Sequence, residues 1–322
     1  MDIKEEIQNI NSALENYNFG TEPSNLYTPI TYFLSLGGKR FRPLLTLIGA
    51  SLYTSDYKKF ILPSIATEVF HNFSLVHDDI MDNAPLRRGM QTVHEKWNAN
   101  IAILSGDVML VKAYELLLNI ETNKLAQSIK NFNQVAVEVC EGQQLDMDFE
   151  SRNDVKIEEY IEMIRLKTAV LLGFSLSFGA YLADAPATDV VSLKQFGDLI
   201  GIGFQLQDDL LDTFGEQAEV GKTIGGDILQ NKKTFLLLKT IELANDNQKK
   251  ELAYWLSVQN QGQEKINAIK KIMSDLGIEK ITKDLMNTYF DKGFSCLHNL
   301  SAKAPQLEFL KQFSYQLIER QK

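Results

Sequence analysis

Two short acidic motifs are the residues of this sequence best suited to chemistry. Each has the pattern D-D-x-x-D, and the two copies occupy residues 78–82 and 208–212. On a helix, the first and last aspartates of such a motif lie on one face, one turn apart, where like charges repel unless a cation stands between them. Carboxylate ligands without histidine or cysteine favour Mg²⁺, Mn²⁺ or Ca²⁺. Each motif therefore predicts a metal site, with an exposed acidic turn as the alternative. The candidate ligands are Asp78, Asp79, Asp82, Asp208, Asp209 and Asp212.

The flanks of both motifs are apolar, which favours a metal site over an exposed acidic turn. Phe73, Leu75 and Val76 precede the first motif, and Phe204 and Leu206 precede the second. Carboxylates that emerge from a buried helix are expected in a cleft, where a metal ion offsets their charge. Two such copies, 130 residues apart, predict one function for both motifs.

Basic residues lie near both motifs along the chain. The run L-G-G-K-R-F-R-P covers residues 36–43, and two arginines follow the first motif after a short loop. Glycines let the backbone approach an anion closely, and arginine contacts phosphate through two donors at once. Each cation taken alone also fits a solvated surface, but together they predict a clamp around a diphosphate. The candidates are Lys39, Arg42, Arg87, Arg88, Lys167, Lys222 and Lys232.

Overall composition agrees with a metal-assisted enzyme. The formal net charge is −9, and no basic run exceeds three residues, so we expect no nucleic-acid partner. Cys140 and Cys296 stand in no zinc-binding spacing and are expected to be free thiols. The N-terminus has no apolar secretory segment, and the apolar run 168–183 is too short to span a bilayer comfortably. We therefore expect a cytoplasmic protein without stable membrane insertion.

Helical periodicity predicts the elements that position these residues. No sustained period-2 alternation is present, and the breaks between periodic segments are short. We therefore expect one all-α domain over residues 1–322, with helices rather than strands carrying both motifs. Predicted long helices cover residues 61–82, 101–119, 124–149, 157–183, 190–213 and 231–244, and shorter amphipathic helices follow from about residue 246.

The motifs and their order resemble the trans-polyprenyl diphosphate synthases, the family of farnesyl and geranylgeranyl diphosphate synthases. The resemblance rests on L-G-G-K-R-F-R-P, on F-H-N-F-S-L-V-H-D-D-I-M-D-N-A-P-L-R-R-G and on G-F-Q-L-Q-D-D-L-L-D. Weaker matches include E-G-Q-Q-L-D at residues 141–146 and Lys167-Thr168. The resemblance covers about residues 30–240. It implies an isoprenoid-synthase-type helical bundle around a deep central cavity, assembled as a homodimer.

The resemblance also implies roles for single residues. A cluster of up to three Mg²⁺ ions would be held by Asp78, Asp82 and Asp208, supported by Asp79, Asp146, Asp209 and Asp212. The allylic diphosphate (dimethylallyl, geranyl or farnesyl) would be bound by Arg87, Lys167, Lys222 and Lys232. Isopentenyl diphosphate would be bound by Lys39, Arg42, His71 and Arg88, and the allylic cation stabilised by Thr168 and Gln205.

Product length is expected to depend on the residues just before the first motif. In the family, bulky residues four and five positions before the first aspartate stop short chains; these positions are Ser74 and Phe73 here. Ser74 is small and lies one turn before Asp78 on nearly the same face, so it leaves room. Phe73 points about 140° away, so its role as a wall comes from the resemblance alone, and ordinary core packing is the alternative. We expect a geranylgeranyl-type product.

Other functions stay open at this point. A farnesyl or longer-chain polyprenyl synthase would share most motifs. A class I terpene cyclase has an all-α fold and an aspartate-rich motif, but it lacks the G-G-K-R run that a second diphosphate needs. A non-catalytic synthase subunit would be expected to lose the aspartate motifs. An assay with isopentenyl diphosphate and each allylic primer distinguishes these alternatives.

Overall fold

The computed structural model describes residues 1–215, 225–258 and 262–319, and it confirms the predicted all-α class. The chain folds into two compact units. The first unit comprises Met1–Gln134, Phe174–Lys194 and Ser301–Gln306; the second comprises Val135–Gly173, Gln195–Leu300 and Leu307–Lys322. Each aspartate motif belongs to a different unit, so each is described within its own surroundings.

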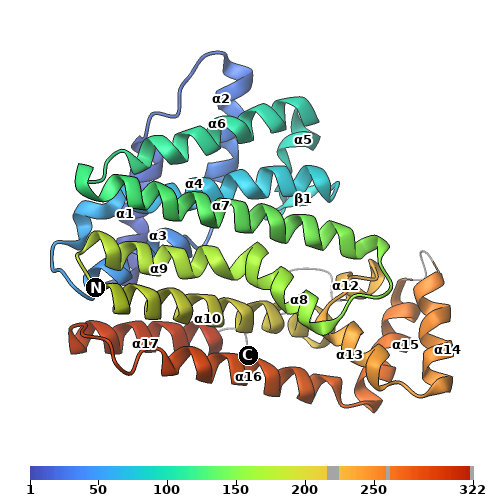
Figure 1. Ribbon diagram of the computed structural model, residues 1–322. Helices are drawn as coiled ribbons and strands as arrows, with labels where there is room; N and C mark the ends of the chain where they lie inside the picture. Colours follow the sequence, from blue (N-terminus) through green and yellow to red (C-terminus); the bar gives the residue numbers. More distant parts are fainter. Residues whose placement is uncertain (216–224, 259–261, 320–322) are drawn as a thin grey trace. The chain divides into compact units, whose positions relative to one another are not determined.

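The first unit is built around helix α4, which packs against α1, α2, α3 and α6 (Figure 1). A two-stranded antiparallel hairpin, β1 with β2, follows α4 directly. The elements are α1 (Ile3–Asn16), α2 (Ser24–Ser35), α3 (Phe41–Ser51), the 3₁₀ turn η1 (Tyr57–Phe60), α4 (Ile61–Met81), β1 (Leu86–Arg87), β2 (Met90–Gln91), α5 (Val93–Lys96) and α6 (Ala99–Leu117).

Helix α4 ends at the first aspartate motif for a local reason. Residues 63–70 are buried without a break, so the first half of the helix is surrounded by other elements, whereas only Asn72, Val76 and Asp79 are buried after them. Asp82 is the C-terminal cap, and Asn83 follows with a positive φ of 49°, a left-handed conformation that stops helices. The three aspartates therefore lie in the last turn, at the negative end of the helix dipole, where a nearby cation is favoured.

Two glycines allow direct backbone contact between helices in the first unit. A Cβ on Gly49 of α3 would lie 2.0 Å from the carbonyl oxygen of Leu176, and one on Gly179 would lie 1.8 Å from that of Thr46. Leu176 and Gly179 belong to α9 (Val170–Leu182). Any larger side chain at either glycine would push α9 away from α3, the helix that carries Arg42.

The second unit contains the later elements of the chain, apart from four helices that it shares with the first unit. In Figure 1, α14 and α15 form an adjacent pair, and α13 packs against α8, α15 and α16. The elements are α8 (Ile157–Ile164), the π-helical turn η2 (Arg165–Ala169), α12 (Gly226–Leu229), α13 (Phe235–Leu243), α14 (Asp246–Ser257), α15 (Gly262–Asp275) and α16 (Ile278–Ser295). Four helices, α7 (Thr122–Ser151), α9, α10 (Ala187–Phe214) and α17 (Ala304–Glu319), contain residues of both units.

Two predicted helix ranges need correction. The helix expected over 231–244 begins only at Phe235, because Asn231 has a left-handed φ of 56° and the side chain of Thr234 caps the first turn. The helix expected over 157–183 contains the π-helical turn η2, so it is not one regular α-helix. This extra winding shifts the faces of Lys167 and Thr168 relative to a regular helix.

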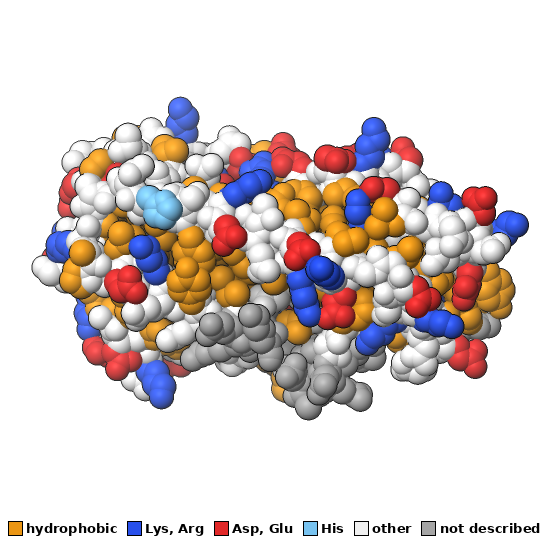
Figure 2. All heavy atoms as spheres, turned by 90° about the horizontal axis from the view of Figure 1, so that it is seen from below, with side chains coloured by type: hydrophobic (Ala, Val, Ile, Leu, Met, Phe, Trp, Pro, Cys, Tyr) orange, Lys and Arg blue, Asp and Glu red, His pale blue; other side chains and the backbone are white. Residues whose placement is uncertain are grey.

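The apolar run that contains α9 is mostly buried. Residues Ile157–Leu182 are long and apolar enough to cross a membrane by composition, but 78% of their most apolar window is buried within the protein. Such a run is typical of a core helix, as the sequence predicted. On the face shown in Figure 2, acidic and basic side chains stand beside one another with hydrophobic side chains between them, so the negative net charge is not gathered into one patch there.

Candidate functional site

The second aspartate of the first motif is a buried partner of arginine. The side chain of Asp79 is 1% exposed, and its Oδ1 accepts hydrogen bonds from Nε and Nη2 of Arg87 at 2.9 and 2.6 Å. Burial raises the pKa of Asp79, whereas the Arg87 guanidinium lowers it. Asp78 lies farther from Arg87, with 3.9 Å between Oδ2 and Nη2. Asp79 therefore holds Arg87 in place, while Asp82 is exposed at the helix end.

The β1–β2 hairpin sends its two arginines to different partners. Arg87 turns back to Asp79 on α4, whereas Arg88 donates from Nη1 to the carbonyl oxygen of Gly37. The left-handed φ values of Arg88 (55°) and Gly89 (77°) form the tight turn that makes this possible. One hairpin thus supplies a cation to the aspartate motif and a second to the Gly-Gly loop.

A cluster of cationic and imidazole groups lies beside that loop. Burial lowers the pKa of Arg42 to about 10, an effect that Glu68 opposes and Arg88 reinforces. The Nε atom of Arg42 is buried and has no hydrogen-bond partner among the described residues. Burial lowers the pKa of His71 well below its usual value, and the charges of Arg42 and Arg88 lower it further. Lys39 is exposed at the edge of this group.

The second motif holds its middle aspartate with neutral donors. Asp209 is 4% exposed, and it accepts hydrogen bonds from the hydroxyl of Tyr160 and from Nε2 of Gln205, the latter at 3.1 Å. Burial, followed by the charge of Asp227, raises the pKa of Asp209 to about 7. Asp208 is exposed beside it. Gln205, predicted to stabilise a cation, therefore also orients Asp209.

The last aspartate of the second motif caps a neighbouring helix. Oδ1 of Asp212 accepts a hydrogen bond from the backbone N–H of Asp227 at 3.0 Å, in the first turn of α12. Lys232, just after α12, lies with Nζ 3.9 Å from Oδ1 of Asp227. The predicted cation Lys232 is thus placed near the second motif through α12. Lys222 lies outside the described residues.

The weaker matches of the sequence also converge. Nζ of Lys167 lies 2.6 Å from Oδ2 of Asp146, so these two predicted site residues form an ion pair within the second unit. A Cβ on Gly142 would lie 2.2 Å from the backbone nitrogen of Lys167. The π-helical turn η2, which contains Lys167 and Thr168, therefore touches α7 at a position that only glycine can occupy. Such π-helical turns are frequent at functional sites.

The residues expected to set product length lie in an aromatic group on α4. The ring of Phe73 contacts that of His77 edge-on at 4.8 Å between centroids and that of Phe70 at 5.6 Å. The hydroxyl of Ser74 donates to the carbonyl oxygen of His71, its own helix, at 2.8 Å. Phe73 is thus braced by neighbours on both sides, whereas Ser74 adds little bulk.

Several residues of these arrangements escaped the sequence analysis. Arg40 and Glu68 form a buried ion pair behind the Gly-Gly loop, Tyr160 holds Asp209, and Gly142 admits η2. Arg40 stands inside the quoted G-G-K-R run and Gly142 inside the quoted E-G-Q-Q-L-D match, so their positions were visible but their structural roles were not. Glu68 and Tyr160 carry no local signal, because their partners lie 28 and 49 residues away along the chain.

The chemistry of the donors fits Mg²⁺ without completing a site. Among the described residues, no three or more His, Cys, Asp or Glu side chains come together as a metal-binding group. Each motif nevertheless offers carboxylate oxygens of the kind Mg²⁺ prefers, with Asp78 partly buried and Asp82 and Asp208 exposed. Mg²⁺ typically takes one or two carboxylates and fills its other positions with water and substrate phosphate.

Comparison with known proteins decides the family. A model described as polyprenyl synthetase matches residues 23–276. The chain belongs to this family. Membership confirms the predicted relationship and makes the chain an enzyme of the prenyltransferase class, of the short-chain type. The match includes both aspartate motifs and the Gly-Gly loop, and it extends beyond the region on which the sequence resemblance rested.

Individual relatives cover almost the whole chain. The geranylgeranyl pyrophosphate synthase of Geoglobus acetivorans is 37% identical over 320 residues, which are 99% of this chain and 98% of the relative. A crystal structure of a geranylgeranyl pyrophosphate synthase is 43% identical, with a TM-score of 0.89 over 99% of this chain and 97% of the other. The geranylgeranyl pyrophosphate synthetase from Pyrococcus horikoshii Ot3 is 31% identical, with a TM-score of 0.91 over 98% and 97%.

Proposed function

We propose that the chain is a Mg²⁺-dependent geranylgeranyl diphosphate synthase. It condenses an allylic diphosphate (dimethylallyl, geranyl or farnesyl) with isopentenyl diphosphate and releases diphosphate. Family membership supports the reaction class, and full-length relatives that carry this product in their names support the product. The whole chain, residues 1–322, acts as one catalytic domain in the cytoplasm.

The observation that carries the proposal is the basic group of the first unit that contains Arg42 and Arg88 beside His71. Arg42 brings a guanidinium whose Nε is buried and has no hydrogen-bond partner in the described part of the chain. Its charge and that of Arg88 lower the pKa of His71, so the group repels further positive charge. A partly buried guanidinium beside a second cation is stabilised by an anion, and isopentenyl diphosphate supplies one. A terpene cyclase, which binds no second diphosphate, has no use for it.

The proposed reaction breaks the C–O bond of the allylic diphosphate, and the leaving diphosphate keeps the electron pair. Asp78 and Asp82 of the first unit and Asp208 of the second would offer carboxylate ligands to Mg²⁺, which would supply positive charge for the leaving group. Arg87, held by Asp79, and Lys167, held by Asp146, donate hydrogen bonds to phosphate oxygens as negative charge grows. Lys222 and Lys232 take the same role in this proposal.

The second half of the reaction forms the new carbon–carbon bond. The side-chain dipoles of Thr168 and Gln205 stabilise the allylic cation, and the alkene of isopentenyl diphosphate donates its electron pair to it. A proton then leaves the resulting cation, and the released diphosphate accepts it. The mechanism therefore needs no separate catalytic base.

A direct assay tests the proposed function. Purified protein is incubated with Mg²⁺, isopentenyl diphosphate and each allylic primer in turn, and products are separated by chain length. We expect a twenty-carbon diphosphate and loss of turnover when a chelator removes Mg²⁺, restored by adding Mg²⁺ back. No condensation with any primer would refute the proposal. A farnesyl or longer product as the end point would leave the reaction class in place but overturn the product assignment.

Product length is proposed to depend on the bulk of Phe73. Because Phe70 and His77 brace its ring, truncation opens space that neighbours do not fill at once. We expect Phe73→Leu to broaden the product range and Phe73→Ala to lengthen the product further. Leu75→Ala, two residues along the same helix and about 200° around it, is the matched control. Unchanged product length in Phe73→Ala would contradict the assignment.

Assembly as a homodimer is also part of the proposal. Along α6 and its C-terminal cap, Leu104, Val111 and Leu118 recur every seven residues and are 57%, 57% and 63% exposed. An apolar stripe of this spacing is typical of a surface that packs against another helix. We expect Val111→Glu to shift the protein from dimer to monomer in sedimentation experiments. A dimer of unchanged affinity would exclude this stripe as the contact.

A further inference from the structure

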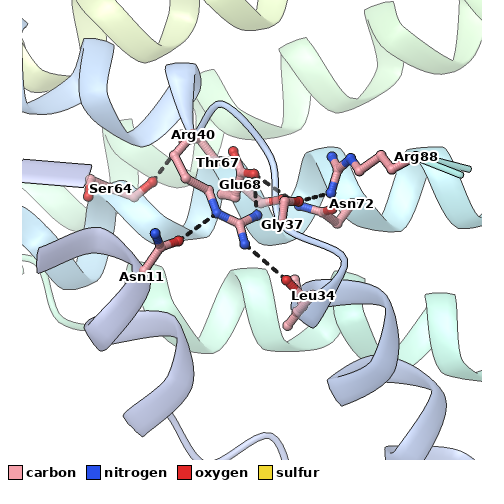
Figure 3. A network of polar contacts seen from close by, with 9 residues as sticks. All are labelled: Asn11, Leu34, Gly37, Arg40, Ser64, Thr67, Glu68, Asn72 and Arg88. Atoms are coloured by element: carbon pink, nitrogen blue, oxygen red, sulfur yellow. Dashed lines mark hydrogen bonds and ion pairs between the residues drawn. The ribbon is translucent and has the colours of Figure 1, made fainter. Parts of the chain in front are cut away.

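The loop that carries the Gly-Gly-Lys sequence is anchored from below by one buried arginine. Arg40 caps the N-terminus of α3 in a left-handed conformation with a φ of 52°. Its side chain is 5% exposed, although its neighbours Gly38 and Lys39 are exposed. Figure 3 shows the guanidinium between residues of three other helices.

Each nitrogen of the Arg40 guanidinium has a partner on a different element. Nε donates to Oδ1 of Asn11 on α1 at 2.9 Å, and Nη2 donates to the carbonyl oxygen of Leu34 on α2 at 2.9 Å. Nη1 donates to Oε1 of Glu68 on α4 at 2.8 Å, and this carboxylate is only 3% exposed. Nδ2 of Asn72 donates to Glu68 as well, at 3.3 Å. The buried pair thus joins α1, α2 and α4 at the base of the loop.

The other side of the same loop holds Arg88. Nη1 of Arg88 donates to the carbonyl oxygen of Gly37 (Figure 3). Gly38 has a φ of 151°, and a Cβ there would lie 3.1 Å from Nη2 of Arg88. The guanidinium therefore rests against bare backbone, so its position follows that of the loop. Moving the loop by a fraction of an ångström would move Arg88 with it.

The charge of Glu68 acts on the same group of residues. It raises the pKa of both Arg42 and Arg88, opposing the effect of their burial. Glu68 also lies three residues before His71, one turn earlier on the same helix. Arg40 and Glu68 thus neutralise each other. They lie near Arg42 and Arg88, the cations proposed to bind an anion. By contrast, the first aspartate motif holds Arg87 through its own carboxylate, Asp79.

We propose that Arg40 and Glu68 are a positioning pair for the isopentenyl diphosphate subsite: they fix the Gly-Gly loop, and through the Gly37 carbonyl they place Arg88. The inference rests on the proposed function and adds that this pair acts on one of the two diphosphates. The pair itself touches no substrate. The allylic subsite, which depends on Arg87 and Asp79, is independent of it.

The first experiment separates the two substrates kinetically. In Glu68→Gln, Arg40 loses the charge that balances it, and the loop loses its anchor. We expect the KM for isopentenyl diphosphate to rise about 10- to 100-fold, the usual effect of removing a residue that orients a ligand-binding group. The KM for the allylic diphosphate should change less than about twofold. Equal increases in both KM values, or no increase in either, would overturn the proposal.

A second variant distinguishes positioning from general stability. Glu68→Gln leaves the buried Arg40 without its counter-charge and is expected to lower the Tm. The double variant Arg40→Met with Glu68→Leu removes both charges, and such apolar replacements often recover the lost stability. We expect its Tm to rise towards that of the wild type while the KM for isopentenyl diphosphate stays high. Recovery of that KM together with the Tm would mean a purely structural role and would refute the proposal.

Direct binding supplies a readout without turnover. Titration of isopentenyl diphosphate into each protein by calorimetry should show the same loss of affinity in both Glu68→Gln and the double variant. Asp189→Asn is the matched control, because Asp189 is a buried carboxylate of the same unit that is held by Tyr53 and Ser301. It should lower the Tm without altering affinity. If the wild type neither binds isopentenyl diphosphate nor turns it over, the proposed function fails. If the wild type binds it and both variants bind it with the same affinity, this inference alone fails.

Discussion

The two aspartate motifs share one sequence pattern and one position in their helices. The first lies in the last turn of α4, which ends at Met81, and the second lies near the end of α10, which ends at Phe214. In both, the second aspartate is buried, with Asp79 1% and Asp209 4% exposed. Both motifs thus turn the second carboxylate into the protein.

The partners of the buried carboxylates differ. Asp79 is held by the Arg87 guanidinium, a full positive charge, whereas Asp209 is held by the neutral groups of Tyr160 and Gln205. Consequently burial raises the pKa of Asp79 against the opposing charge of Arg87, while burial and the negative charge of Asp227 together raise that of Asp209 to about 7. The same D-D-x-x-D pattern therefore creates two different electrostatic environments, because the packed neighbours rather than the motif decide the balance.

The largest expected effect falls equally on both motifs. Asp78→Ala and Asp208→Ala should each lower kcat by about 1000-fold, since each removes a carboxylate proposed to hold Mg²⁺ for the leaving group. Steady-state kinetics at saturating Mg²⁺ measures this, and circular dichroism checks the fold. Asp291→Ala, an exposed carboxylate of α16, is the control. Full activity in either motif variant would remove that aspartate from the proposed metal site.

The charged partner of the first motif should matter more for stability than the neutral partner of the second. Arg87→Met leaves Asp79 buried and unbalanced, which should lower the free energy of unfolding by about 2–3 kcal/mol. Urea titration measures the loss. Arg152→Met is the control, because Arg152 pairs with the more exposed Asp154 and Glu159, and exposed ion pairs stabilise a protein little. Equal losses in the two variants would contradict a special role for Arg87.

Removing the neutral partner is a milder change. Tyr160→Phe deletes one hydroxyl and leaves Asp209 with Gln205, so we expect a loss of about 1 kcal/mol in the free energy of unfolding. The same urea titration detects it. Tyr53→Phe is the comparison, because Asp189 keeps two donors from Ser301 when the Tyr53 hydroxyl is lost. A loss for Tyr160→Phe that equals that of Arg87→Met would show that the two motifs do not differ in this respect.

The smallest effect concerns pH and only the first motif's helix. Burial and the nearby arginines lower the pKa of His71 in the folded protein. As pH falls, His71 is therefore protonated in the unfolded chain before it is protonated in the folded protein, so the free energy of unfolding decreases below about pH 7. One histidine with an ordinary pKa in the unfolded chain and a much lower pKa in the folded protein decreases the free energy of unfolding by about 0.7 kcal/mol between pH 7 and pH 6. His71→Gln should remove this part of the pH dependence. His298→Gln, at an exposed position, should not, and equal slopes in wild type and His71→Gln would contradict the assignment.

Local sequence signals sufficed for much of the fold. Helix α4 was predicted over 61–82 and observed over Ile61–Met81, because apolar spacing, the early Pro63 and the stop at Asn83 all act within a few residues. The prediction failed over 231–234, where Asn231 adopts a left-handed conformation that its sequence permits but does not require. The side-chain amide of Asn231 donates to the carbonyl oxygen of Leu256 in α14, so a helix that is distant in the sequence stabilises that turn.

The candidate site was foreseen in its parts but not in their connections. Asp146 and Lys167 were each named from a weak match, yet their ion pair depends on the π-helical turn that Gly142 admits. A single sequence reveals neither the winding of that turn nor the contact, because both arise where α7 meets η2. Lys222, also predicted, lies outside the residues that the structure describes.

By itself, the sequence determined the helical class, the two acidic motifs and the family, since periodicity and motif spacing are local and specific. Tertiary structure alone decided which charges are paired inside the protein. Of the cations in the Gly-Gly-Lys-Arg-Phe-Arg run, Arg40 is paired with Glu68, whereas the Nε of Arg42 is buried with no hydrogen bond in the described structure. This difference between Arg40 and Arg42 depends on the packing of α4 beside α3. Burying a charge costs free energy unless a partner offsets it, so the buried Arg40 needs Glu68.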